Sequence, residues 1–311
     1  MKFCKRALVI TFTVLLVLAA SNAVFAAEKI KFGHVDWPGV TVKTQVAIRI
    51  LDLLGYEAET RSLSLPVVCK ALSSGDLDLF LAAWLPTMNN LVKGYLADGT
   101  MISLGLNLDE TIYTLAVPKY VWEAGVKSHA DLNKFADKFN KKIIGIEPGN
   151  DGNQLVLGMI KNNTYNLKDW KLVEGSAAAM MVAVGAAYKK NEWVCWLGWA
   201  PHWMNMVHEV KYLEDPEHIW GSEPEVVHTM ANSKFPEKNP NVAKFMTQFK
   251  VTPQIQSGWI EEYSRQKKDP AKVADAWIRN NLGIVDQWVY GVTTADGKTR
   301  ARDAVRTGLG L

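Results

Sequence analysis

The sequence predicts an α/β protein of two lobes, each built on a parallel β-sheet. Short apolar runs alternate with segments of helical spacing along most of the chain, which is typical of strands and helices in turn. Two extended apolar runs, at residues 110–118 and 226–232, enclose a further α/β segment. We therefore expect a discontinuous first domain, residues 27–116 and 226–311, an inserted second domain, residues 117–225, and a cleft between them.

The first 26 residues have the pattern of a secretory signal peptide. Three basic residues precede an apolar run at residues 7–20, and small residues follow, so we expect cleavage after Ala26 or after Ala27. The apolar run is too short to span a membrane comfortably. Cys4 precedes the run and is not placed to become a lipidated N-terminus. These features predict a soluble periplasmic protein with no stable membrane insertion after cleavage.

Composition restricts the class of partner. Cleavage would remove three of the 35 basic residues and none of the 32 acidic ones, which leaves a formal charge of zero. A balanced charge argues against nucleic acid or an anionic membrane bound through a broad basic face. Two cysteines would remain, Cys69 and Cys195. We expect two buried thiols in different domains, although an oxidising compartment would also permit a bridge.

The elements of the first domain follow from the period of the apolar residues. A strand at residues 29–37 runs into the turn Trp37-Pro38-Gly39, and the spacing predicts a helix from Val40 to Leu54. The other elements expected are a strand at 57–63, a helix from 64 to about 75, a buried strand at 76–84, a strand at 101–106, and helices from 239 to the end. The strand at 76–84 also ends in Trp, with Pro two residues later.

The second domain begins with a charged segment, residues 119–140, of helical pattern. Residues 141–160 then predict a strand, a Gly/Asn-rich turn and a helix. The first backbone N–H groups of that helix, near Asn150 to Asn153, could bind an oxygen of a ligand, or the turn could be an ordinary Asn cap. A strand at 170–174 and a helix from Ser176 to Lys190 follow.

The segment 193–205 holds four of the twelve tryptophans. Residues 191–199 predict a buried strand, with Gly198, Pro201 and His202 marking the turn where the chain leaves the sheet. Trp199 would lie at the carboxyl end of this strand, where open α/β sheets bind ligands. The alternative is that Trp199 is a core residue.

Signatures of enzymes and of metal sites are missing. The sequence has no GxSxG, no HExxH and no P-loop, and its six histidines lack the spacing of metal ligands. We expect no catalytic residues, no metal and no cofactor. The alternative from another class is an exported enzyme that acts on a methylated amine.

Four aromatic residues lie at the ends of predicted elements: Trp37, Trp84, Tyr113 and Trp199. A quaternary ammonium ion has no N–H group to donate, so a protein binds it by surrounding its diffuse charge with aromatic faces. Such a set indicates a site for a small quaternary ammonium ligand.

The mature chain resembles, over nearly its full length, the periplasmic substrate-binding proteins of ABC importers for quaternary ammonium compounds. The similar segments are RILDLLGY, SGDLDLFLAAWLPTM, IYTLAV, GIEPGNDGN, NEWVCWLGWAPHWMN and WVYGVTTADG. They are closest to the choline-binding branch and its glycine betaine-binding relatives. The resemblance implies a type II two-lobed periplasmic-binding-protein fold with two hinge crossings and the ligand in the interdomain cleft. It also implies a monomer that delivers an osmoprotective solute to a permease and an ATPase, although a sensor docking on a receptor is a further alternative.

Site residues are also implied by this resemblance. The aromatic box of the choline-binding branch falls here on Trp37, Trp84, Tyr113 and Trp199, and the Asn of the turn falls on Asn150. Each residue type is present.

One position departs from the choline-binding pattern. That pattern reads W-T-D after the first Trp, whereas this chain reads Trp37-Pro38-Gly39 and lacks the Asp. In betaine-binding relatives a Gly and the next apolar residue offer backbone N–H groups to the ligand carboxylate, which Gly39 and Val40 resemble. A helix N-terminus favours an anion, so the substitution favours glycine betaine over choline, with His202 as a further candidate for a polar contact.

Overall fold

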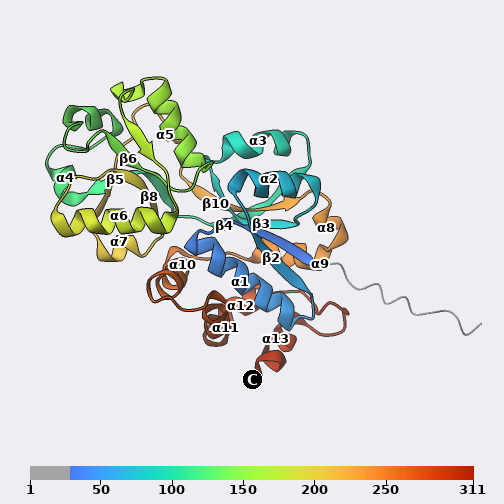
Figure 1. The fold of residues 1–311 in the computed structure, drawn as a ribbon. Coiled ribbons are helices and arrows are strands. Elements are labelled where there is room, and N and C mark those ends of the chain that lie inside the picture. Colours follow the sequence, from blue (N-terminus) through green and yellow to red (C-terminus); the bar gives the residue numbers. More distant parts are fainter. Residues whose placement is uncertain (1–28) are drawn as a thin grey trace, which may run out of the picture.

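The computed structural model describes residues 29–311, so the predicted signal peptide and Cys4 lie outside the described residues. The described chain forms two lobes, each around one five-stranded sheet (Figure 1). Two separate hydrophobic cores fill the lobes. The α/β organisation in two lobes is therefore as predicted, although neither sheet is purely parallel.

The sheet of the first lobe has the strand order β2-β1-β3-β10-β4. Its strands are β1 (Ile30–His34), β2 (Ala58–Ser62), β3 (Leu79–Leu85), β4 (Met101–Leu108) and β10 (Val226–Asn232). β1 pairs in parallel with β2 and β3, whereas β10 runs antiparallel to both β3 and β4. The expectation of a parallel sheet was thus wrong for β10, because this strand enters from the other lobe and not through a helix on its own sheet.

The sheet of the second lobe repeats this plan with the order β7-β6-β8-β5-β9. Its strands are β5 (Ile112–Pro118), β6 (Lys142–Ile144), β7 (Lys171–Val173), β8 (Trp196–Ala200) and β9 (Val210–Tyr212). Here β5, which arrives from the first lobe, is antiparallel to its neighbours β8 and β9. The chain changes sheet between Leu108 and Ile112 and again between Tyr212 and Val226. The exact domain boundaries, at residues 116 and 225, stay a prediction.

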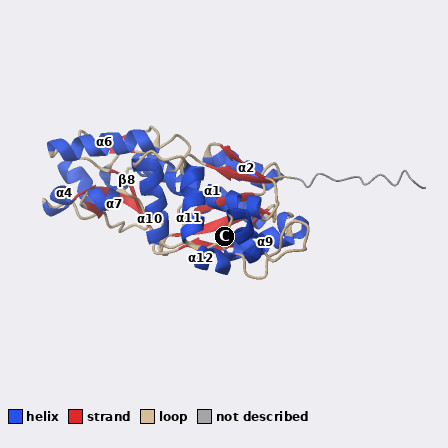
Figure 2. Cartoon of the chain, turned by 90° about the horizontal axis from the view of Figure 1, so that it is seen from below, coloured by secondary structure: helices blue, strands red, loops and turns tan. Residues whose placement is uncertain are grey.

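Helices cover both sides of the first sheet. They are α1 (Pro38–Leu53), α2 (Leu65–Ser74), α3 (Asn89–Ala97), α8 (Phe235–Lys238), α9 (Pro240–Gln248), α10 (Pro253–Ile260), the π-helical turn η3 (Glu261–Arg265), α11 (Pro270–Asn280), α12 (Leu282–Trp288) and α13 (Ala301–Leu309). α2 and α3 lie on one side, and α1 lies on the other, where it packs against α10, α11 and α13 (Figure 1). Figure 2, a view from below, shows α10, α11 and α12 in front of the strands.

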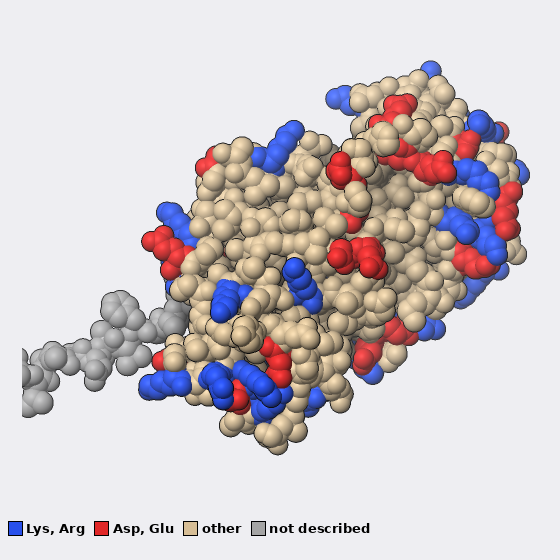
Figure 3. Space-filling model, turned by 180° about the vertical axis from the view of Figure 1, so that it is seen from behind, with Lys and Arg blue, Asp and Glu red and all other residues tan. Residues whose placement is uncertain are grey.

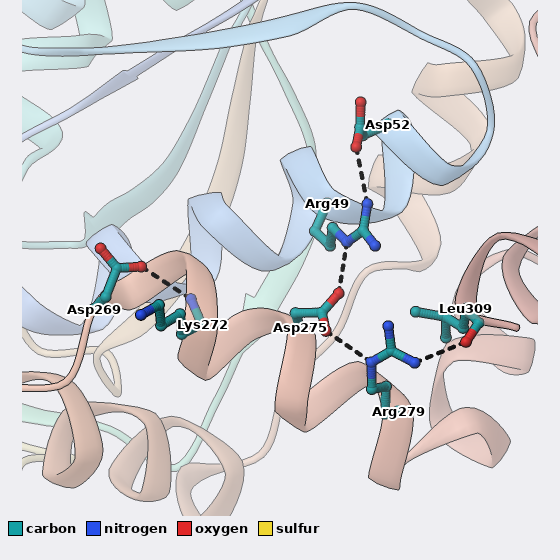
Figure 4. Close-up of polar contacts among 7 residues, drawn as sticks. All are labelled: Arg49, Asp52, Asp269, Lys272, Asp275, Arg279 and Leu309. Atoms are coloured by element: carbon teal, nitrogen blue, oxygen red, sulfur yellow. Dashed lines mark hydrogen bonds and ion pairs between the residues drawn. The ribbon is translucent and has the colours of Figure 1, made fainter.

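A chain of ion pairs fastens the C-terminal half of α1 to the end of the protein (Figure 4). Arg49 donates to Asp275 Oδ1 of α11 at 2.8 Å, and Arg279 donates to Asp275 Oδ2 at 2.8 Å and to the carbonyl oxygen of Leu309 at 2.8 Å. These arginines hold the pKa of Asp275 below its usual value. The orientation of α1 is therefore fixed far from its N-terminus.

The second lobe is built with shorter helices. They are α4 (Lys119–Glu123), the 3₁₀ helices η1 (His129–Phe135) and η2 (Thr164–Asn166), α5 (Asp151–Lys161), α6 (Ala177–Lys190) and α7 (Met204–Val207). The helical pattern predicted over residues 119–140 is thus broken into α4 and η1. Gly125 lies between them with φ of 113°, a backbone conformation that interrupts a right-handed helix.

The Trp-rich strand β8 differs from its prediction in two details. It begins at Trp196, so Trp193 precedes the strand, and Gly198 lies inside it and not at a turn. A Cβ atom at Gly198 would stand 2.5 Å from the Cβ of Ala116 on the neighbouring β5. Glycine is needed there because the strands approach closely, a use that the sequence pattern does not distinguish from a turn.

Cys69 and Cys195 are buried and free, each in the core of a different lobe. Burial raises the pKa of Cys69 to about 12 and that of Cys195 further, so both stay thiols. The expectation of two buried thiols is confirmed.

The surface mixes both signs of charge. On the face drawn in Figure 3, Lys and Arg lie close to Asp and Glu over both lobes. Within residues 29–311 no helix combines the length and the apolar character needed to cross a bilayer.

Candidate ligand-binding pocket

A mostly apolar pocket lies between the lobes and draws its walls from both. The first lobe contributes Trp37, Pro38, Gly39, Val40, Lys43, Ala82, Trp84, Val227, Gln256 and Ile260, and the second contributes Tyr113, Ile146, Asn150, Asp151 and Trp199. Seven of the eight predicted ligand residues are in this set, and His202 is the exception. A small molecule in this pocket would contact both lobes at once.

Three aromatic rings form adjoining walls of the pocket. The ring of Tyr113 lies 5.9 Å from that of Trp84 and 6.4 Å from that of Trp199, at interplanar angles of 64° and 88°. Tyr113 and Trp199 stand directly opposite in the β5–β8 ladder, so their side chains share one face of that sheet. Trp84 comes from the end of β3 in the other lobe. The rings therefore meet edge to face and are not stacked on each other.

Trp37 occupies the position before α1 and bridges the lobes. Its indole Nε1 donates to Glu147 Oε1 at 2.8 Å, across a sequence separation of 110 residues. The side chain packs against both hydrophobic cores, as Trp84 does. Burial raises the pKa of Glu147 above its usual value, and the bond from Trp37 opposes this rise. Trp37 is thus both a pocket wall and a contact between the lobes.

Asn150 caps α5 and also holds Tyr113. Its Oδ1 accepts from the backbone N–H of Asn153 at 3.1 Å and from the Tyr113 hydroxyl at 3.0 Å, while its Nδ2 donates to Asp151 Oδ1 at 2.8 Å. The capping interpretation of this turn is therefore correct, and one Nδ2 hydrogen is left for another acceptor. The hydrogen bond to Asn150 therefore fixes the orientation of the Tyr113 ring.

Asp151, which sequence reasoning missed, is the acidic group of the pocket. It is 5 % exposed, and its Oδ2 has no hydrogen-bond partner among residues 29–311. Burial is the largest cause that raises its pKa, to about 7, and the nearby Glu147 adds to the rise. Glu225, behind the pocket, also has its pKa raised by burial, to about 8. This part of the cleft is therefore poor in compensating positive charge.

His202 lies behind the aromatic wall. Its ring centroid is 5.0 Å from that of Trp199, and its Nδ1 accepts from the backbone N–H of Met204 at 3.2 Å. It is 2 % exposed, and burial lowers its pKa to about 3, so the ring is neutral. In this position His202 supports Trp199 from the side away from the pocket.

The opposite end of the pocket presents hydrogen-bond donors. Helix geometry leaves the N–H groups of Gly39 and Val40 without an intrahelical acceptor, since the first backbone bond of α1 runs from Thr41 to the Trp37 carbonyl. A Cβ atom on Gly39 would stand 2.9 Å from Nε2 of Gln256, a residue of α10 that also lines the pocket. The space that a side chain at position 39 would take is filled by the Gln256 amide.

Lys43, also missed from the sequence, follows one helical turn after Gly39. It is 1 % exposed, and its Nζ donates to Asn107 Oδ1 at 2.6 Å and lies 3.5 Å from the Leu81 carbonyl oxygen. Burial lowers its pKa to about 7. The available signal in the sequence is the position of this lysine among the apolar residues of the predicted helix face.

No group of three or more His, Cys, Asp or Glu side chains in the described part of the chain is arranged to hold a metal ion.

Comparison with known proteins gives concordant results. The model of a family described as the substrate binding domain of ABC-type glycine betaine transport system matches residues 28–280. A solved structure of an ABC-transporter choline binding protein in complex with choline is similar over 92 % of this chain and 99 % of its own, with a TM-score of 0.88 and 33 % identity. Lactococcal OpuAC, in its closed-liganded conformation with glycine betaine, is similar over 84 % of this chain and 98 % of its own, with a TM-score of 0.76 and 30 % identity.

A curated relative is the glycine betaine/carnitine transport binding protein GbuC of Listeria monocytogenes. It is 30 % identical over 161 residues, which are 52 % of this chain and 53 % of that protein.

Proposed function

Because the chain belongs to the family of substrate-binding domains of ABC-type glycine betaine transport systems, we propose that it captures a trimethylammonium osmolyte, glycine betaine or choline, in an aromatic cage. The family consists of transporter substrate-binding proteins and not of enzymes. We further propose that the protein acts as a monomer in the periplasm and delivers its ligand to a permease that is driven by an ATPase.

The observation that carries the proposal is the set of ring faces around one pocket. Trp84, Tyr113 and Trp199 meet at steep angles from strands of both lobes, and Trp37 lines the same pocket. Each desolvated aromatic face contributes about 2 kcal/mol to binding a cation. Four faces give roughly 8 kcal/mol before the cost of association, which is about 4 kcal/mol or more. A micromolar ligand needs about 8 kcal/mol net, so polar contacts must add to the cage.

Those polar contacts are proposed at the two ends of the pocket. The free N–H groups of Gly39 and Val40 are suited to a carboxylate, because they carry the positive end of the α1 dipole. Asn150 keeps one donor, and Asp151 keeps one free oxygen, in the lobe that supplies Tyr113 and Trp199. A ligand that engages both ends would also hold the lobes together.

Titration calorimetry tests the proposal directly. The purified mature protein is titrated with glycine betaine, choline, carnitine, proline betaine and trimethylamine N-oxide, and the ligand is then recovered and analysed. We expect saturable binding of glycine betaine or choline at one site per chain, with unchanged ligand recovered in full. Absence of binding by every trimethylammonium compound would refute the cage. Conversion of the ligand by pure protein would favour an exported enzyme.

A further inference from the structure

The pocket holds a buried cation that has no anion. Lys43 is 1 % exposed, yet its Nζ contacts only the amide oxygen of Asn107 and the carbonyl oxygen of Leu81. No ion pair of Lys43 exists within residues 29–311, and burial alone accounts for its lowered pKa. A buried charge without a counter-ion is costly, so such a residue calls for an anion from elsewhere. The residue lines the pocket, which makes a bound ligand the available source.

The neighbours of Lys43 at this end of the pocket are donors as well. Gly39 and Val40, one turn earlier in α1, offer two backbone N–H groups. The Gln256 amide reaches to Gly39, and the residue is 4 % exposed with its Oε1 unpartnered in the described chain. Amide nitrogen and oxygen are not distinguished by shape, so this side chain can turn either atom to a ligand. A cation and several donors that line one pocket suit a carboxylate.

An acidic group lies in the other lobe. Asp151 lines the pocket from the start of α5 and forms no ion pair with Lys43, which lies on α1. The two unpaired groups of opposite sign thus face one cavity from different lobes. A ligand with a positive and a negative group supplies both missing counter-charges at once. A simple cation supplies a counter-charge for Asp151 only, and it places a second positive charge in the pocket that Lys43 lines.

We propose that Lys43 is a specificity-determining residue that binds the carboxylate of the ligand and selects zwitterionic betaines over choline. This inference rests on the proposed function, since it concerns the second group of a trimethylammonium ligand in the same pocket. It also explains how Gly39 and Lys43 act together: the helix start lacks a side-chain carboxylate and carries an ammonium group one turn later.

The test compares Lys43→Met with a control, Lys70→Met. Lys70 is an exposed residue of α2 that does not line the pocket, so its substitution removes the same charge from the protein and leaves the site intact. Calorimetry at pH 7 measures the Kd of each variant for glycine betaine and for choline. Thermal unfolding confirms that each variant is folded.

We expect Lys43→Met to weaken glycine betaine binding on the order of 10- to 100-fold, the effect of losing a charge-assisted hydrogen bond. Choline binding should stay the same or tighten, because a like charge is removed. Lys70→Met should change neither. If Lys43→Met lowers the affinity for both ligands by the same factor, or leaves the affinity for glycine betaine unchanged, the role of Lys43 is refuted. The aromatic cage is not affected by that outcome. If the unmodified protein binds neither ligand, the proposed function and this inference both fail.

A second measurement uses the unmodified protein and does not depend on the variant folding. Binding heats are compared in two buffers of different ionisation enthalpy, which gives the number of protons taken up with each ligand. The protein should take up more protons when it binds glycine betaine than when it binds choline. The carboxylate of glycine betaine favours the charged form of Lys43, and a simple cation does not. Equal proton uptake for the two ligands would overturn the inference.

Discussion

Replacement of Trp199 by alanine tests whether the aromatic wall binds ligand or only fills space. The indole lies 6.4 Å from the ring of Tyr113 and 5.0 Å from that of His202, and it forms one face of the pocket. Its loss removes one cation–π contact, about 2 kcal/mol, and about 1 kcal/mol of methyl burial. The first contribution alone corresponds to an affinity loss of about 30-fold, and the two together to about 150-fold.

Trp193 is the matched control for this substitution. It is a partly buried tryptophan of the same lobe, packed 5.3 Å from the rings of both Phe135 and Phe139, and it does not line the pocket. Trp193→Ala and Trp199→Ala should both lower the free energy of unfolding, each by less than the roughly 3–5 kcal/mol of a fully buried tryptophan. Only Trp199→Ala should weaken ligand binding.

Calorimetry with glycine betaine and choline, together with urea unfolding, separates the two effects. Trp199→Ala should weaken the binding of both ligands to the same extent, because both carry the trimethylammonium group. If Trp199→Ala keeps its affinity within about twofold of the unmodified protein, or if Trp193→Ala loses as much, Trp199 is a core residue and the cage argument fails for this face.

Three further predictions concern specificity, motion and pH. Gly39→Asp should weaken the binding of glycine betaine by about 1–3 kcal/mol and reverse the preference towards choline, because the new carboxylate repels an anion and displaces the Gln256 amide. Competition calorimetry measures the order of the two affinities, and an unchanged order would contradict this prediction. Ligand should compact the protein in X-ray scattering and, at a hundredfold excess over Kd, raise its stability by about 2.7 kcal/mol; identical scattering curves with and without ligand would argue against closure of the lobes. Between pH 6 and pH 8 the ratio of choline affinity to glycine betaine affinity should rise, by roughly tenfold, because the protonated fraction of Lys43, with a pKa of about 7, falls by that factor. Ionisation of Asp151 and Glu225, with pKa values of about 7 and about 8, favours the ammonium group that both ligands share; a constant ratio across this range would contradict the assignment.

Much of the fold could be predicted because local signals agreed with the tertiary structure. The predicted helix from Val40 to Leu54 is α1, Pro38–Leu53, and the predicted helix from Ser176 is α6, which has Ser176 as its N-cap. The resemblance to quaternary ammonium-binding proteins is confirmed by the family match. Strand direction was not predictable, since the period of β5 and β10 is the same in parallel and antiparallel sheets.

The candidate site could be predicted only in its aromatic part. Aromatic residues at the ends of predicted elements are visible in a sequence, and Trp37, Trp84, Tyr113 and Trp199 line one pocket. Lys43 and Gln256 were missed because their role depends on what packs around them. A lysine in a helix is ordinarily on the solvated face, and its lack of a counter-ion is visible only in three dimensions.

The two ends of α1 make different contacts, and this determines which substitutions the helix can accept. The first two turns of α1 line the pocket through Pro38, Gly39, Val40 and Lys43. Arg49, near the last turn, joins the Asp275 and Arg279 network that anchors the helix. Substitutions at the start of α1 would change the lining of the pocket and leave that anchor untouched. The lining of the pocket can therefore change through substitutions at the start of one helix, while the remainder of the scaffold stays the same.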